Sequence, residues 1–154
     1  GGHKYAAGLT LKKENLEKFI IEFEKIVSKK ITLEQLQPNI AIDMEINIEE
    51  IDYKLFRIID QLSPFGPTNK RPIFLSKSVS DSGFAKQVGD MKTHLKLNII
   101  KNEKVIPAIG FNIGQYLQSI NRVNDFDICY SIDQNEWNGR KELQIQILDL
   151  KISS

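Results

Sequence analysis

The spacing of apolar residues predicts a helix first and β-strands later. Between Lys13 and Ser28, six apolar residues recur at steps of three and four, as on one side of an amphipathic helix: Leu16, Phe19, Ile20, Phe23, Ile26 and Val27. Thr32 and Gln35 have the spacing of a capping box, which predicts one short helical turn before Pro38. We place the first domain boundary at Pro38, so that residues 1–38 form one unit.

A strand and a second amphipathic helix are predicted for residues 39–62. Apolar and polar residues alternate from Ile40, which predicts a half-buried strand with one apolar side: Ile40, Ile42, Met44 and Ile46. Asn47 and Glu50 then have the spacing of a helix cap, and apolar residues continue at helical steps: Ile48, Ile51, Leu55, Ile58, Ile59 and Leu62. The Pro- and Gly-rich stretch at residues 63–67 ends this helix.

The remaining sequence predicts five strands and one short helix. A long first strand, Ile73 to Gly89, is interrupted around residues 80–83. The other predicted elements are strands at His94–Ile100 and Val105–Phe111, a helix at Ile113–Ile120, and strands at Phe126–Ile132 and Lys141–Ile152. In the last strand the apolar phase changes after Ile147, which predicts a β-bulge. Three strands, a helix and two strands are the order of an OB-type five-stranded Greek-key β-barrel, so the predicted fold class is α+β.

An OB barrel binds oligonucleotides across its second and third strands and in two neighbouring loops. The second strand would present His94 and Lys96 to solvent, and Lys92 lies in the loop before it. The loop expected between the fourth and fifth strands, residues 134–140, contains Trp137 and Arg140. Trp137 either stacks on a base or packs on the barrel rim beside the Asn-Gly turn that follows it. His94 is more typical of a surface imidazole than of a catalytic one.

Composition and charge narrow the function classes. The chain has 154 residues and is 41% hydrophobic and 27% charged, as in a soluble globular protein. It has no run of roughly 20 apolar residues, so we expect no membrane span. A single cysteine forms no internal disulfide, which favours the cytoplasm. The net charge of +1 hides a basic segment, residues 63–125, with nine Lys and Arg against four Asp and Glu, which suits an anionic partner such as nucleic acid.

No catalytic constellation is visible in the sequence. The two histidines are far apart, and there is no nucleophile elbow, phosphate-binding loop or His-Glu pair at helical spacing. Two acidic pairs, Asp43 with Glu45 and Asp125 with Asp127, are better explained as solvated carboxylates than as metal ligands. The chain begins at Gly1 without Met, so we expect it to be a piece of a longer protein.

Three stretches carry a family resemblance. Gly1-Gly2-His3-Lys4-Tyr5-Ala6-Ala7-Gly8 resembles the Gly-Gly-His signature of the DHHA1 domain of DHH-family phosphoesterases. Residues 63–74, Ser-Pro-Phe-Gly-Pro-Thr-Asn-Lys-Arg-Pro-Ile-Phe, resemble the linker of the RecJ family of single-stranded-DNA-specific exonucleases, and residues 94–97 and 135–140 resemble its OB segments. Thr68 and Lys70 replace the usual Gly and Pro, which leaves the stiffness of the linker open.

The resemblance implies a division of the chain and a role for it. Residues 1–38 would be the C-terminal end of a DHHA1 domain and residues 39–154 a RecJ-type OB domain, in an enzyme of DNA repair and recombination that degrades single strands from the 5′ end. The family's metal-binding half, which uses Mn or Mg, is missing, so this chain would hold no cofactor and be inactive alone. Gly1, Gly2 and His3 would contact substrate phosphate. The implied partners are single-stranded DNA and, as a further candidate, single-strand-binding protein.

Two other functions remain open at this point. OB barrels also bind proteins, and residues 39–62, with two basic against six acidic side chains, would suit a basic partner. A DHH-family phosphodiesterase that acts on very short oligonucleotides or cyclic dinucleotides would share the Gly-Gly-His signature. Binding that weakens steeply with salt would distinguish nucleic acid from a protein partner.

Overall fold

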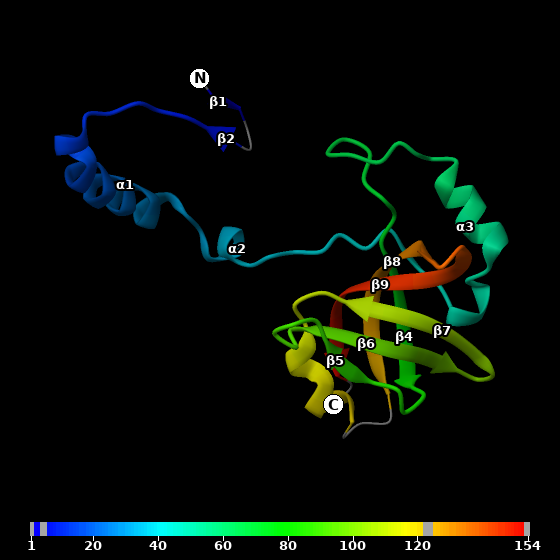
Figure 1. Cartoon of the computed structure of the whole chain (residues 1–154). Coiled ribbons are helices and arrows are strands. Elements are labelled where there is room, and N and C mark those ends of the chain that lie inside the picture. Colours follow the sequence, from blue (N-terminus) through cyan, green and yellow to red (C-terminus); the bar gives the residue numbers. More distant parts are fainter. Residues whose placement is uncertain (1, 4–5, 122–124, 153–154) are drawn as a thin grey trace. The chain divides into compact units, whose positions relative to one another are not determined.

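The computed structural model describes residues 2–3, 6–121 and 125–152, and the chain divides into two compact units, Gly1–Ile40 and Ala41–Ser154 (Figure 1). The first unit contains β1 (Gly2–His3), β2 (Ala6–Ala7), the 3₁₀ turn η1 (Lys13–Asn15), α1 (Leu16–Lys30) and α2 (Leu33–Leu36). No helix of the described residues is long and apolar enough to cross a membrane.

The two helices of the first unit lie where the sequence predicts them. Thr32 accepts a hydrogen bond from the Gln35 N–H, and the Gln35 side chain accepts one from the Thr32 N–H, so the capping box of α2 is confirmed. The apolar stripe of α1 is mostly exposed: the side chains of Leu16, Ile20, Phe23 and Ile26 are 46–56% accessible. This helix therefore forms without burying the side that its sequence makes apolar.

Five strands of the second unit pair in a ring. β4 (Phe74–Asp81) pairs with β8 (Phe126–Trp137), β8 with β9 (Arg140–Ile152), β9 with β7 (Lys104–Gly110) and β7 with β6 (His94–Lys101). β6 returns to β4 through only two registered pairs, Ser80 with Ile100 and Asp81 with Ile99. The pairing that closes the ring is therefore short. Only the β7–β9 pairing in the ring is parallel. This is the predicted OB-type Greek-key order.

Short elements complete the second unit. β5 (Lys86–Val88) lies between β4 and β6 in the sequence and pairs with β6, which confirms the predicted interruption of the first long strand. The predicted helix between the third and fourth barrel strands is a 3₁₀ turn, η3 (Gly114–Tyr116), that runs into α4 (Leu117–Ile120).

The inner sides of the strands form one apolar core. On β6, Leu95, Leu97 and Ile99 are fully buried, as their alternation predicts. Successive residues of a strand point to opposite faces, so His94 and Lys96 lie on the outer side of the barrel. Burial of the core thus fixes which side chains of β6 face outward.

The predicted bulge in the last strand is confirmed. The register of β8 and β9 shifts between Cys129, which is opposite Asp149, and Tyr130, which is opposite Ile147. Leu148 is the extra residue on β9. Because of it, Ile147 and Leu150 are both buried although they lie three residues apart.

The strand predicted from Ile40 is mostly wrong. The structure has only a two-residue edge strand, β3 (Met44–Glu45), which pairs in parallel with the start of β4. Of the predicted apolar side, Ile40, Ile42 and Met44 are exposed and Ile46 alone is buried. The reason is that polar and main-chain contacts, rather than burial, attach this segment to the barrel.

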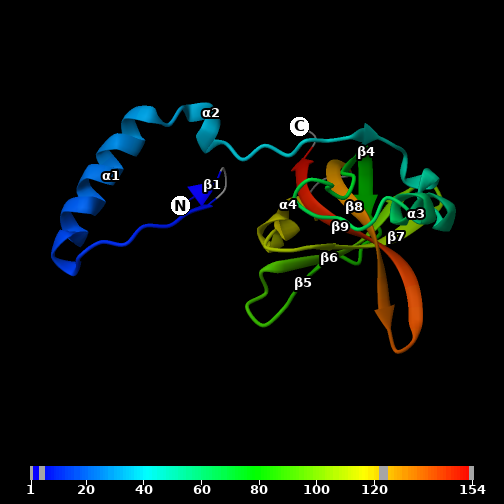
Figure 2. The ribbon, with the colours of Figure 1, turned by 90° about the horizontal axis from the view of Figure 1, so that it is seen from above.

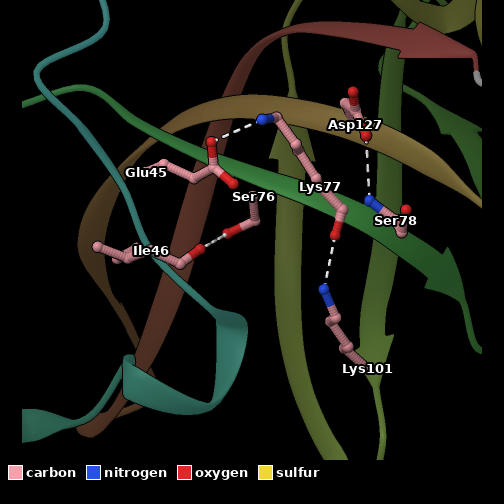
Figure 3. Close-up of polar contacts among 7 residues, drawn as sticks. All are labelled: Glu45, Ile46, Ser76, Lys77, Ser78, Lys101 and Asp127. Carbon is pink, nitrogen blue, oxygen red and sulfur yellow. Dashed lines mark hydrogen bonds and ion pairs between the residues drawn. The ribbon is translucent and has the colours of Figure 1, made fainter.

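Figure 3 shows these attaching contacts. Lys77 Nζ lies 2.7 Å from a Glu45 carboxylate oxygen, and the Ser76 hydroxyl donates to the Ile46 carbonyl at 2.6 Å. Ser78 has a positive φ of 49° at an irregularity of β4, where its N–H donates to Asp127 at 3.0 Å. The segment before the barrel is therefore held at its main chain and its carboxylates.

The helix predicted over residues 48–62 is interrupted. The Asn47–Glu50 cap is present, but it begins only the 3₁₀ turn η2 (Ile48–Glu50). Asp52 then adopts an extended backbone, and its carboxylate accepts the Leu55 N–H at 2.7 Å, so α3 (Tyr53–Asp60) begins anew. A second cap inside the apolar stripe divides the helix in two.

The turn after α3 is fixed by side-chain contacts. The Asn69 side chain donates to the carbonyls of Leu62 at 2.8 Å and Pro64 at 3.0 Å. Arg71 donates to the Ile132 carbonyl at 2.9 Å, and its guanidinium lies 4.7 Å from the centre of the Phe65 ring. These contacts hold the linker although Thr68 and Lys70 depart from the family pattern.

Candidate nucleic-acid interface

Four outward side chains line up across the barrel from strand to strand. Lys86 of β5 is registered with Lys96 of β6, Lys96 with Ile109 of β7, and Ile109 with Gln146 of β9. We call these four residues the cross-barrel row. Figure 2 shows the β8–β9 hairpin and the segment around β5 projecting to the same side of the barrel, downward in that view.

The two lysines of the row are registered with each other, and neither forms an ion pair with another described residue. Like charges directly opposite on antiparallel strands destabilise a sheet. In the described ranges, no carboxylate lies within ion-pair distance of Lys86, Lys92 or Lys96. Lys86 Nζ instead lies 4.5 Å from the centre of the Phe84 ring. An anion bound here would relieve the repulsion between the two ammonium groups.

His94 joins two turns next to the row. Its Nδ1 accepts the Asn112 N–H at 3.2 Å, and its ring meets Phe111 nearly at right angles, with centroids 5.2 Å apart. The main chain of Gly89, which has a φ of +85°, comes so close that a Cβ there would lie 3.0 Å from the imidazole. His94 is therefore half-buried between the Gly89 turn and the Phe111 ring, whereas the sequence predicts a surface imidazole.

A hollow of about 190 Å³ lies beside the row, between the end of β7 and the hairpin. Its lining combines two apolar side chains with four amides: Ile109, Phe111, Gln134, Asn135, Gln144 and Gln146. Asp133 also borders it, with its carboxylate 3.8 Å from the guanidinium of Arg71. The hollow therefore offers a ring and several groups that both donate and accept hydrogen bonds.

The predicted loop at residues 134–140 is instead a hairpin of two long strands. β8 continues to Trp137 and β9 starts at Arg140, which is exposed and registered with Trp137. Only Asn138 and Gly139 form the turn, with φ values of 50° and 74°, as Asn-Gly does in a two-residue turn. The side chain of Trp137 lies outside the described part of the structure.

The proposed phosphate-contacting residues at the start of the chain belong to the other unit. Gly2 and His3 form β1, which pairs with β2. Gly1 and the side chain of His3 lie outside the described residues. The sequence-predicted site residues thus fall into three groups: Lys92, His94 and Lys96 at β6, Trp137 and Arg140 at the hairpin, and Gly1 to His3 in the first unit.

Several residues of the candidate interface were not predicted from the sequence. Phe84 and Lys86 lie in the segment between β4 and β6, and Phe111 follows the last residue of β7, where it is 50% exposed. Their signal is the period of two: Lys86 is two residues after Phe84, and Phe111 two after Ile109. Which partner each residue meets depends on the register between strands, which is not local in the sequence.

Most carboxylates of the acidic segment before the barrel contact other groups of this chain. Five of its six carboxylates have internal partners: Asp43 with the Ile73 N–H, Glu45 with Lys77, Glu49 with Asn102, Glu50 with the Asn47 N–H, and Asp52 with the Leu55 N–H. The Glu49 carboxylate accepts a hydrogen bond from its own main chain and one from Asn102, and both lower the pKa of Glu49. Of these contacts only Glu45–Lys77 is an ion pair, so the other carboxylates keep their negative charge.

The described residues do not fit a metal ion. Across residues 2–3, 6–121 and 125–152, no three His, Cys, Asp or Glu side chains gather where they could ligate one. The two acidic pairs considered from sequence are not simply solvated, because Asp43, Glu45 and Asp127 each accept or pair with a neighbouring group.

Comparison with known proteins agrees with this geometry. The single-stranded-DNA-specific exonuclease RecJ of Bacillus subtilis is 30% identical over 154 residues, which cover 99% of this chain and 19% of that protein. The RecJ exonuclease of Salmonella typhimurium is 26% identical over 154 residues, 97% of this chain and 26% of that protein. The chain thus spans about a fifth to a quarter of the length of these relatives.

The fold is shared with a solved structure. RecJ of Thermus thermophilus in complex with Mn²⁺ matches all of this chain and 22% of its own length, with a TM-score of 0.69 at 21% identity. The family model of the RecJ OB domain matches residues 42–149. These contain every strand of the barrel ring except the last three residues of β9. The chain therefore belongs to the RecJ OB domain family.

Proposed function

We propose that this chain binds single-stranded DNA along the cross-barrel row and the β8–β9 hairpin, as the C-terminal part of a RecJ-like exonuclease. The observation that carries the proposal is the facing pair Lys86 and Lys96, whose ammonium groups lack a carboxylate partner among the described residues. Two phosphates of a strand would supply the missing negative charge. Lys92, in the turn before β6, and Arg140, at the hairpin turn, are further cations of the proposed path.

Exposed rings and amides favour a single strand over a duplex. Phe84 and Phe111 are 40% and 50% exposed, and the second borders the hollow with its amide lining. Unpaired bases offer flat faces for stacking and free edges for hydrogen bonds, whereas a duplex keeps both inside. Trp137 at the hairpin is a further stacking candidate.

The same proposal gives this chain a place in a larger enzyme. Hydrolysis from the 5′ end would need Mn or Mg, for which the described residues offer no group of three His, Cys, Asp or Glu ligands. Other parts of the full-length protein would hold the metal. Gly1, Gly2 and His3 would contact substrate phosphate, and the barrel would hold the strand. The proposed setting is DNA repair and recombination in the cytoplasm, with single-strand-binding protein as a further partner.

Fluorescence anisotropy with a labelled oligothymidylate tests the proposal. We expect binding to the single strand to exceed binding to a duplex of the same length. Its log affinity should fall linearly with log salt, and the Lys86→Ala/Lys96→Ala double variant should reduce that slope by roughly 1.4, about 0.7 for each single-strand phosphate contact. Without the two cations, their share of the electrostatic part of the binding is lost.

Lys151→Ala is the matched control, because it removes one exposed lysine from the opposite surface, beside Asp149 and Cys129. Its salt slope should equal that of the unmodified chain. Equal affinity for duplex and single strand, or an unchanged slope in the double variant, would contradict the proposed interface.

A further inference from the structure

The hollow beside the cross-barrel row has the size and chemistry of a site for one base. Its volume is about 190 Å³, and one of its lining residues, Ile109, is the registered neighbour of Lys96. Apolar surface comes from Ile109 and Phe111, and polar surface comes mostly from amides. A nucleobase likewise combines an apolar flat face with a polar edge.

Phe111 is fixed in position before any ligand arrives. The near-perpendicular His94 ring lies 5.2 Å away, and the same imidazole accepts the N–H of Asn112, the next residue of the turn. The absence of a Cβ at Gly89 leaves the space that the imidazole occupies. An exposed ring that loses little freedom on binding is a favourable stacking surface.

The polar lining suits a base rather than a phosphate. Gln134, Gln144 and Gln146 each carry a carbonyl that accepts and an amino group that donates, so together they can match any base edge by rotating. The charged group at the rim is the carboxylate of Asp133, which repels phosphate and is offset in part by Arg71. Phosphates would therefore lie toward the lysines and the base toward the hairpin.

We infer that this hollow holds one unpaired nucleobase of the bound strand, stacked on Phe111 and hydrogen-bonded at its edge by the amides of β8 and β9. The inference rests on the proposed function, because it assumes a strand along Lys86 and Lys96. It adds an orientation, with the backbone over β5 and β6 and one base turned toward the β8–β9 hairpin. The site accepts any of the four bases, because the amides supply donors and acceptors alike.

Oligothymidylates that carry a single 2-aminopurine at successive positions test this site, because stacking on an aromatic ring quenches the probe. We expect strong quenching at one position when the unmodified chain binds. Phe111→Leu should abolish that quenching and weaken binding roughly 5- to 150-fold, the effect of losing one stacked base. Phe111→Tyr should retain both, and thermal melting should show that both variants are folded.

The possible failures are distinguishable. If the unmodified chain binds the oligonucleotide and Phe111→Leu changes neither the quenching nor the affinity, the base site is wrong and the lysine interface stands. If the quenching is lost in Phe111→Leu but also in Phe111→Tyr, stacking is not its cause and the base site is again wrong. If the unmodified chain does not bind the strand even at low salt, both the interface and the base site are wrong.

Discussion

The two outer surfaces of the barrel differ in what their charged groups contact. Around β3, β4 and β8, Glu45 pairs with Lys77 and raises the pKa of that lysine, while Asp127 accepts the Ser78 N–H. Across β5, β6 and β7, the facing Lys86 and Lys96 have no acidic partner in the part of the chain that the structure describes. The first surface holds the leading segment in place, and the second keeps its charge available.

This difference separates structural charge from functional charge. A carboxylate that caps a turn stabilises the fold, and its removal should change stability, whereas an exposed ion pair holds its charges together and contributes little to stability. A lysine opposite another lysine costs the fold some stability, and a bound anion would relieve that cost. The unpaired cations of the described residues are therefore better guides to function than the net charge of +1.

The largest effect that we expect concerns the attachment of the leading segment. Tyr130 is buried, and its hydroxyl forms a hydrogen bond with the Ser76 hydroxyl, which in turn donates to the Ile46 carbonyl. Burial raises the pKa of Tyr130 to about 12, so the folded chain keeps this proton at pH values where the unfolded chain has lost it. The contribution of neutral Tyr130 to the free energy of unfolding is complete below about pH 10. It falls by about 3 kcal/mol as the pH rises to about 12.

Urea unfolding between about pH 8 and 12 measures this loss in the unmodified chain and in Tyr130→Phe. The variant should be less stable at neutral pH by about 1 kcal/mol, because Ser76 loses a hydrogen-bond partner. It should also lose this part of the alkaline dependence. Parallel curves for the two proteins would show that Tyr130 does not titrate differently in the folded state.

A medium effect is expected at the hairpin, on the other surface. If a base stacks on Trp137, then Trp137→Ala should weaken single-strand binding by about 1 to 3 kcal/mol and leave unfolding nearly unchanged. If the indole instead packs on the barrel rim, the variant should lose about 3 to 5 kcal/mol of stability. We expect the first result. Arg140→Ala, the control, should mainly reduce the salt slope.

The smallest effect should come from the paired lysine. Lys77 and Glu45 form an exposed ion pair, and such pairs contribute little to stability. Lys77→Ala should therefore leave the melting temperature and the DNA affinity close to those of the unmodified chain. A loss of affinity as large as that of Lys96→Ala would remove the distinction between paired and unpaired lysines.

Much of the barrel could be predicted because its signals are local. The alternation around Leu95 and Leu97, and the phase change near Leu148, follow directly from which residues the core buries. The same reasoning failed at Ile40 to Met44, where an equally regular alternation lies on an exposed edge. Alternation predicts which residues share a side, but it does not show whether anything covers that side.

The candidate interface was predicted only in part. Lys96 and His94 followed from the strand pattern, and the residues that face them did not, because cross-strand register joins positions far apart in the sequence. Lys86 is identified as a candidate binding residue only by its registered pairing with Lys96, and Phe111 only by its contact with His94. The division of the second helix at Asp52 also depended on one capping hydrogen bond that the apolar stripe concealed.

An NMR titration of the ¹⁵N-labelled chain with an oligothymidylate tests the functional difference between the two surfaces most directly. Amide shifts should be largest at Lys86, Lys96, Phe111 and Gln146, and they should diminish as salt is added. The opposite surface, around Leu75, Cys129 and Lys151, should serve as the silent reference. Shifts concentrated at that opposite surface, or no shifts at low salt, would contradict single-strand binding by the cross-barrel row.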